Sequence, residues 1–542
     1  MNRIISLRYL IFLLAIVAFG ATSCRPTGDE LLSYGQNDYQ AFYDANHSYA
    51  GEFKALWTAL NENYCIWDFE AQYGLDWDQV YATYLPKFEE LDKRQEDVTD
   101  LELNLLYSEF LNKLHDGHLQ LQVKNRATGA YMTFSPGTQR ILRERGAQYI
   151  ADRDNITTLD AYQTSAVEDK YRIRDYAKAS STTVMAFLMD SICNQLVSGI
   201  DTYVATVDSL GGPNETNNEI YADLLTLREK AVKVLDRLHV SSTELDKSIS
   251  SIASTYNTLC TQYKMIAKQV GVEMKSVEKN LSNDGLGALQ VAVFEGNIVY
   301  MRLNSFYLTS SLEPSYVSSD TASMYYEYQM SVQRTWRHWF DTIQALDAAG
   351  TLGGVIFDVR NNGGGYVNDY KFALGALLPS GGWESHTMRV KNGSGRLDFG
   401  PLVPFIVKTY PEEHAVIDQR PIVVLANSRS VSMAENTTWG VKSQPNGCFI
   451  GTRTFGGLSA LNTSTTDYSA VYSGAFGVQG STPIYGYVPK YVCLYPQADG
   501  SLRPLESYGF EPDIDLPLDV KLWRSSQRDN QLEAAIDYIR SK

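Results

Sequence analysis

Apolar residues repeat in alternating steps of three and four in three stretches, and this spacing is typical of long helices that pack through one face. The second and third stretches are each preceded by a Ser/Thr-x-x-Glu capping pattern, and Gly-Gly-Pro at 211–213 separates the first from the second. The sequence therefore predicts an antiparallel three-helix bundle over residues 181–280. The three stretches are residues 185–203, 220–238 and 245–270.

Helical periodicity also covers residues 39–121, which we predict to form a helical N-terminal domain. Its clearest face carries Phe53, Leu56, Trp57, Leu60 and Tyr64. Another helix is expected over residues 101–114. Residues 122–180 give weak and mixed signals and receive no assignment.

From residue 289 to residue 518, short apolar runs of strand length alternate with helical stretches. Strands buried on both faces have such continuous apolar runs, so this region predicts an α/β layered core. A C-terminal helix is expected over residues 519–542. The runs lie at 297–303, 354–359, 421–425 and 448–450, with a long helix at 324–346.

Two of these predicted strands end in segments that could perform chemistry. The first runs into Arg-Asn-Asn-Gly-Gly-Gly at 360–365, where glycines leave backbone N–H groups bare for an anion or an oxyanion. The second leads to a turn with Ser428, Ser430 and Ser432 and then to a helix, whose N-terminus favours negative charge beside a hydroxyl. Serines near a helix start are also common caps, so the turn alone leaves both roles open.

Taken with their flanks, these segments resemble the catalytic core of peptidase family S41, the C-terminal-processing or tail-specific proteases and their tricorn-core relatives. The resemblance implies an α/β core of the crotonase/ClpP-like spiral type at 289–518, with the bundle standing where tail-specific proteases carry a PDZ domain. It also implies that the nucleophile lies three residues before Glu435, at Ser432. Four blocks occur in the order of the family, at residues 358–365, 425–435, 450–456 and 505–513.

The general base separates two branches of this family. Tail-specific proteases use a lysine after a Thr-x-Gly turn, and here that position holds Gly457. The tricorn-like branch uses a histidine in an upstream turn, which the resemblance places at His118, with Gly117 where that branch has serine. A histidine accepts a proton near neutral pH because its ordinary pKa is about 6.5. His115 is the competitor in the same motif, and we expect it on the preceding helix.

The resemblance also implies the remaining catalytic groups. Glu506 maps to the carboxylate that holds the tautomer of the base. The oxyanion hole is expected to combine the N–H of Met433 with one from the glycine run, Gly364 first and Gly363 as the alternative. No metal or organic cofactor is implied.

We therefore predict a serine peptidase that hydrolyses peptides or unfolded chain ends through an acyl-enzyme. The same core occurs in a retinoid-binding protein, so the fold does not guarantee catalysis. The alternative is a catalytically silent lipoprotein that binds a ligand or a peptide.

Residues 1–24 have Arg3 and Arg8, an eleven-residue apolar run, and small residues before Cys24. This run is shorter than the about 20 apolar residues of a membrane span. The segment resembles a bacterial lipoprotein signal peptide, which implies lipidation of Cys24, a tether over residues 25–38 and a place in the cell envelope, in the periplasm or at the outer membrane. The alternative is a plain signal peptide cleaved nearby.

The formal net charge is −16 and no basic block occurs, which argues against nucleic acid and anionic membrane surfaces as partners. A peptide or protein substrate, and a membrane reached only through the anchor, are the expected partners. The other cysteines are scattered and odd in number, so we predict buried free thiols, with one disulfide as the alternative, rather than a zinc site or a disulfide framework. They are Cys65, Cys193, Cys260, Cys448 and Cys493.

Overall fold

The computed structural model of the chain forms two compact units, which are described separately. One contains Ala179–Leu286 and Val317–Ser331, and the other contains Asp29–Lys178, Gly287–Tyr316 and Val332–Lys542. The expected signal segment and tether, with Cys24, lie outside the described residues. No helix in the described ranges is long and apolar enough to span a bilayer. The structure describes residues 48–542 except 95, 154–158, 166, 180, 214–217, 241, 270–288, 322, 378–381, 394, 409, 411–418, 461–475, 478–479 and 481.

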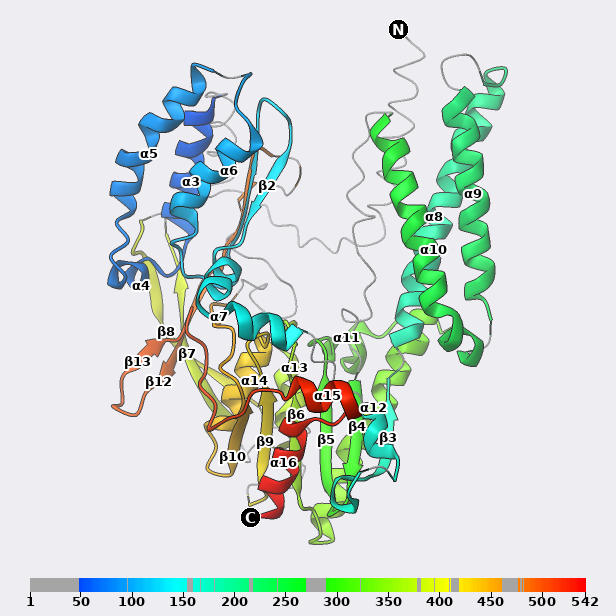
Figure 1. The fold of residues 1–542 in the computed structure, drawn as a ribbon, viewed down its shortest axis with the longest axis vertical. Coiled ribbons are helices and arrows are strands. Elements are labelled where there is room, and N and C mark those ends of the chain that lie inside the picture. Colours follow the sequence, from blue (N-terminus) through cyan, green and yellow to red (C-terminus); the bar gives the residue numbers. More distant parts are fainter. Residues whose placement is uncertain are drawn as a thin grey trace. The chain divides into compact units, whose positions relative to one another are not determined.

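Three long helices make up most of the first unit. They are α8 (Ser181–Ser209), α9 (Asn218–Leu238) and α10 (Ser242–Gln269), and Figure 1 shows them side by side. Each of the three contributes apolar side chains to one buried cluster, so the repeating faces close on a common core. On α9 the buried residues are Leu224, Leu227, Ala231, Val234 and Leu238.

A seven-stranded sheet forms the centre of the second unit, in the order β14-β10-β9-β6-β5-β4-β3. The strands from β5 to β14 run parallel, while β3 and β4 pair antiparallel at the other edge. Every residue of β5, β6 and β9 is buried. The predicted α/β core is therefore confirmed at this level, and the spiral arrangement stays a prediction. The strands are β3 (Ile173–Lys178), β4 (Leu289–Phe294), β5 (Ile298–Leu303), β6 (Gly354–Asp358), β9 (Ile422–Ala426), β10 (Gly447–Gly451) and β14 (Ile514–Asp515).

Helices cover the two faces of this sheet. Ile356 of β6 packs in a cluster with apolar residues of α16 (Asn530–Arg540), whereas its neighbour Phe357 packs against Trp339 of α12 (Met324–Ala348). Successive strand residues point to opposite faces, so α16 and α12 lie on opposite sides of the sheet.

The predicted single helix at 519–542 is wrong. The chain forms α15 (Val520–Ser526) and α16, because Gln527 takes a left-handed conformation (φ 58°) and Asp529 caps the second helix.

Four helices open the described chain, as the periodicity predicts: α3 (Tyr49–Asn63), α4 (Trp67–Gln72), α5 (Trp77–Asp92) and α6 (Asp100–Leu111). The predicted apolar face of α3 enters their common core. The helix expected to reach residue 114 ends at Leu111, so His115 lies in the following loop and not on a helix.

Residues 122–180, which the pattern left unassigned, hold short strands and one polar helix. β1 (Gln120–Lys124) pairs with β2 (Tyr131–Phe134) and with the distant β11 (Ile484–Tyr487). The helix α7 (Pro136–Arg153) bends at Arg145 and buries few apolar side chains, which explains why periodicity misses it.

A further antiparallel sheet has the order β13-β12-β7-β8. Short helices and turns of 3₁₀ type connect the larger elements. The strands are β7 (Trp383–Lys391), β8 (Phe399–Val407), β12 (Tyr491–Pro496) and β13 (Leu502–Pro504); the connecting pieces are α11 (Thr309–Leu312), α13 (Asp369–Ala373), α14 (Met433–Lys442), η1 (Asp160–Gln163), η2 (Asp169–Tyr171), η3 (Pro314–Tyr316) and η4 (Gly375–Leu377).

Five cysteines fall in the described ranges, and all five are free and buried, as the sequence predicts. Burial raises the pKa of four of these thiols, those of Cys65, Cys193, Cys448 and Cys493, which keeps them protonated and unreactive.

Candidate active site

The serine-rich turn joins β9 to α14 and gives its three serines different surroundings. Ser428 and Ser430 are fully buried, and their hydroxyls donate to Asp152 Oδ2 at 2.6 Å and to Val359 O at 2.8 Å. Ser432 is partly exposed and is the N-cap of α14, with φ 59° and ψ −118°, a conformation that non-glycine residues rarely adopt. Two serines therefore hold the turn, and the third sits at a strained strand-to-helix elbow, which is typical of an exposed nucleophile.

The glycine run after β6 lies against this elbow. A Cβ built on Gly364 would come within 2.6 Å of Ser432 Cβ and 3.1 Å of Met433 N, so only glycine permits this approach. The N–H of Met433 is the first of α14 and has no intrahelical acceptor. Gly364 and the N–H of Met433 therefore both lie beside Ser432, and the oxyanion hole stays a prediction.

Asn362 sets the position of the glycine run, and the sequence analysis missed it. Its side chain donates to Leu303 O at 2.7 Å and accepts the N–H of Gly364 at 2.8 Å, while its carbonyl accepts the N–H of Val431 at 2.9 Å. The N–H of Gly364 is therefore engaged in this structure, and Gly363 faces open space. A buried asparagine directly before three glycines could have indicated this role.

The carboxylate of Glu506 holds the turn that contains His118. Its Oε1 accepts the N–H of Gly117 at 2.6 Å, and its Oε2 accepts the N–H groups of Leu458 and Ser459 at 2.7 and 2.5 Å. Glu506 thus joins the histidine turn to the loop at residues 454–459 through backbone groups.

A second buried carboxylate, that of Glu435, joins the serine elbow to the same loop. It accepts hydrogen bonds from the Thr454 hydroxyl at 2.6 Å, from the N–H groups of Gly456 and Gly457 at 2.8 Å each, and from the N–H of Ser432 at 3.3 Å. Burial raises the pKa of Glu435 to about 7. The two carboxylates together bring the segments of His118 and Ser432 to one loop.

Three glycines from separate segments meet beside this loop. A Cβ on Gly117 would lie 2.5 Å from the Cα of Gly457, and a Cβ on Gly137 of α7 would lie 2.6 Å from the Cα of Gly117. A Cβ on Gly457 would come within 2.9 Å of Val431 Cγ1. The glycine at position 117, where the tricorn-like branch has serine, is therefore required by the close approach of two backbones.

We expect Gly117→Ala to lower the free energy of unfolding by about 1–3 kcal/mol, because the added methyl group collides with the backbone of Gly457. Urea unfolding followed by tryptophan fluorescence measures this. The matched control is Gly146→Ala in α7, where a Cβ meets nothing within 4 Å and where alanine favours the helix. Equal unfolding midpoints for the two variants would contradict the close approach.

His118 is neutral under ordinary conditions because burial lowers its pKa to about 4. A neutral imidazole is the form that can accept a proton. Its Nδ1 is buried and has no hydrogen-bond partner among the described residues. The structure therefore does not join Glu506 to the ring by a hydrogen bond, as the expected orienting role would require.

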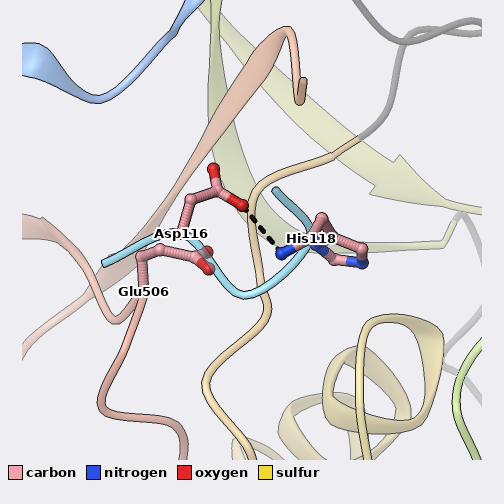
Figure 2. A group of neighbouring side chains, drawn as sticks. All are labelled: Asp116, His118 and Glu506. Atoms are coloured by element: carbon pink, nitrogen blue, oxygen red, sulfur yellow. Dashed lines mark hydrogen bonds between the residues drawn. The ribbon is translucent and has the colours of Figure 1, made fainter. Parts of the chain in front are cut away.

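Asp116, His118 and Glu506 each place one possible ligand atom within 4.8 Å of the others (Figure 2). Their side chains are of types that bind metals. Backbone N–H groups, however, already occupy three of the four carboxylate oxygens. We therefore interpret the group as a hydrogen-bonded cluster and derive no metal step.

His115 has a different environment from His118. Its Nδ1 lies 2.6 Å from Glu70 Oε2, its N–H donates to Glu70 Oε1 at 2.7 Å, and its ring stacks on Tyr73 at 4.1 Å. Glu70 is itself buried in the helical N-terminal region and also accepts the hydroxyl of Tyr64 at 2.6 Å. These contacts give His115 a structural role.

Comparison with known protein families gives a match to part of the chain. The family model described as peptidase family S41 matches residues 297–478, about a third of the chain, and this range includes Gly364 and Ser432 but neither His118 nor Glu506. None of the curated proteins matches the sequence significantly.

Three solved structures illustrate how distant the structural likeness is. A candidate peptidase from Parabacteroides merdae is 16% identical, with 91% of this chain and 97% of that chain covered and a TM-score of 0.45. Mature CPAF is 12% identical, with 91% and 96% covered and a TM-score of 0.41. The photosystem II D1 C-terminal processing protease is 18% identical, with 41% and 42% covered and a TM-score of 0.24. At these values the likeness carries no argument about function.

Proposed function

We propose that the protein is a serine peptidase of the S41 type, which hydrolyses peptide bonds in peptides or unfolded chain ends through an acyl-enzyme. The observation that carries this proposal is the strained elbow of Ser432 packed against Gly364 and the free first N–H of α14. The match of residues 297–478 to peptidase family S41 supports it.

In this mechanism Ser432 attacks the carbonyl carbon of the scissile bond. His118, which is neutral, takes the hydroxyl proton and later gives it to the leaving amine. The N–H of Met433 and one N–H of the glycine run hold the oxyanion. Since Gly364 donates to Asn362, either that bond yields to substrate or Gly363 supplies the donor. Water then releases the acyl group from Ser432.

Glu506 and Glu435 act in this proposal by fixing the turns that carry the base and the nucleophile. Both carboxylates are at most 1% exposed and accept several backbone N–H groups at the loop 454–459. Such fixed positioning raises the rate of an enzyme, because the reacting groups are already held in the orientation that the reaction needs.

The experiment is labelling of the mature chain, residues 25–542, with a fluorophosphonate probe, followed by peptide mass spectrometry to locate the adduct. We expect a single adduct on Ser432, which is lost in His118→Ala and retained in His115→Ala, the matched control. A folded wild-type chain without any adduct would reject the peptidase and favour the silent binding protein.

We also propose that Cys24 carries a lipid that anchors the protein outside the cytoplasm, as the sequence of residues 1–24 suggests. Cells grown with an alkyne fatty acid are expected to label the wild-type protein, and Cys24→Ala is expected to remain unlabelled. A wild-type protein without label would leave a plain signal peptide as the explanation, and equal labelling of the two would place the lipid on another residue.

A further inference from the structure

The histidine turn leaves two buried polar atoms without partners. Asp116 is 0% exposed, and its Oδ1 accepts the N–H groups of His118 at 2.7 Å and Leu119 at 3.0 Å. Its Oδ2 meets no donor, and Nδ1 of His118 meets neither donor nor acceptor, among the residues that the structure describes. An unpaired buried polar atom costs about 1–3 kcal/mol. One hydrogen bond from Nδ1–H to Oδ2 would satisfy both atoms.

Glu506 is the less suitable partner for this ring. Both of its oxygens already accept backbone N–H groups, at 2.5 to 2.7 Å, and these bonds fix it to the turn and to the loop 454–459. Asp116, by contrast, has one oxygen without any partner. Figure 2 shows both carboxyl groups beside the turn. One possible ligand atom of each residue lies within 4.8 Å of the others, so the carboxyl group of Asp116 and the ring of His118 are close neighbours.

We propose that Asp116 is a positioning residue for the base, and that its Oδ2 accepts Nδ1–H of His118, already in the free protein and more closely when substrate occupies the site. This inference rests on the proposed function, in which His118 is the base. Glu506 then holds the backbone of the turn, and Asp116 selects the tautomer in which Nε2 is free to take the proton of Ser432. Catalytic hydrogen bonds are often long before substrate binds and tighten afterwards.

The charges around Asp116 make this pairing dependent on pH. Burial is the largest cause that raises the pKa of Asp116, and the neighbouring carboxylate of Glu506 raises it further. The other ionisable groups that face it are Glu70, Tyr64 and Cys65. A protonated Oδ2 cannot accept Nδ1–H, so the pairing strengthens as pH rises through the pKa of Asp116. The imidazolium formed during the reaction then lies beside ionised carboxylates, which stabilise it.

The test uses the full chain with ¹⁵N-labelled histidine, because the shifts of the ring nitrogens report the tautomer directly. His118→Gln identifies the signals of His118. At pH 8 we expect a protonated Nδ1 and a bare Nε2 in the wild type, and the opposite tautomer in Asp116→Asn, which keeps an oxygen for the two backbone N–H groups. Labelling of Ser432 by fluorophosphonate is expected to fall about 10²- to 10⁴-fold in Asp116→Asn, as wrong-tautomer variants do.

Glu506→Gln is the comparison variant: it keeps one acceptor oxygen but turns an amide donor toward backbone N–H groups, so we expect lower stability with the tautomer of His118 unchanged. A wild-type ring protonated on Nε2 would overturn the proposal without any variant, even if Asp116→Asn did not fold. Labelling of Asp116→Asn within twofold of wild type, with the tautomer unchanged, would also overturn it. A wild-type chain with protonated Nδ1 but no adduct on Ser432 would instead reject the peptidase while supporting the pairing of Asp116 with His118.

Discussion

Ser432→Ala is expected to lose about 10³- to 10⁶-fold in kcat/KM for peptide hydrolysis, and all covalent labelling, because the variant lacks the attacking oxygen. Its free energy of unfolding should fall by only about 0.5–2 kcal/mol, the usual cost of an N-cap serine, because the elbow is partly exposed. Cleavage of an unfolded protein or a peptide library, together with urea unfolding, measures both quantities.

Ser430→Ala is the matched control within the same turn. Its hydroxyl accepts the N–H of Asn427 at 3.0 Å and donates to Val359 O at 2.8 Å, both in the interior. Its removal leaves buried groups unpaired and is expected to cost about 1–3 kcal/mol of stability while the adduct still forms on Ser432. Loss of the adduct in a folded Ser430→Ala variant, with labelling retained in Ser432→Ala, would transfer the nucleophile to Ser430.

Arg360→Met is expected to lower the free energy of unfolding by about 3–5 kcal/mol, the typical cost of removing one partner from a buried charge network. The guanidinium of Arg360 is fully buried and contacts Asp358 at 2.6 Å and Asp529 at 2.7 Å. It also donates to Gln531 at 2.7 Å, and so fixes the end of β6, where the glycine run starts, to the N-cap of α16. The Arg360 guanidinium and its hydrogen bonds outweigh burial and lower the pKa of Asp358 to about 2.

The control for Arg360 is Arg503→Met, whose pairing with Asp499 at 3.2 Å is mostly exposed on both sides. Exposed pairs contribute about 0–1 kcal/mol, so its unfolding midpoint in urea should hardly move. Similar shifts for Arg360→Met and Arg503→Met would contradict the buried network. Because ionised Asp358 has a depressed pKa, its contribution is present above the ordinary pKa of aspartate and is lost as pH falls toward about 2.

The strands and long helices were predictable where burial dominates the sequence. β5, β6 and β9 are buried at every residue, and such strands appear as continuous apolar runs. The polar helix α7 gave no such signal, because it docks through Gly137 and through arginines that cap carbonyl groups. Arg145, for example, donates to the carbonyls of Arg453 and Thr454 at 2.8 and 2.7 Å.

Only the residues of the candidate site that lie in local sequence motifs could be predicted from the sequence. Ser432 and Gly364 lie in recognisable turns, and the structure brings them into contact. The side-chain amide of Asn362 and the carboxylate of Glu435 form hydrogen bonds with residues from other segments, so no local sequence pattern could predict these bonds. The expected bond from Glu506 to the ring of His118 also depends on side-chain placement, and here Glu506 binds backbone N–H groups instead.

The packing of Gly117 against Gly457 limits which general base this site can hold, a histidine or a lysine. A lysine at position 457, where tail-specific proteases carry theirs, would bring a Cβ within 2.9 Å of Val431 Cγ1, while the histidine turn occupies the space beside the loop. The two kinds of base therefore compete for one location, and a Gly457→Lys exchange alone is expected to displace the histidine without seating the new amine. Replacing the histidine by a lysine base in this fold would therefore require changes in both the histidine turn and the loop 454–459.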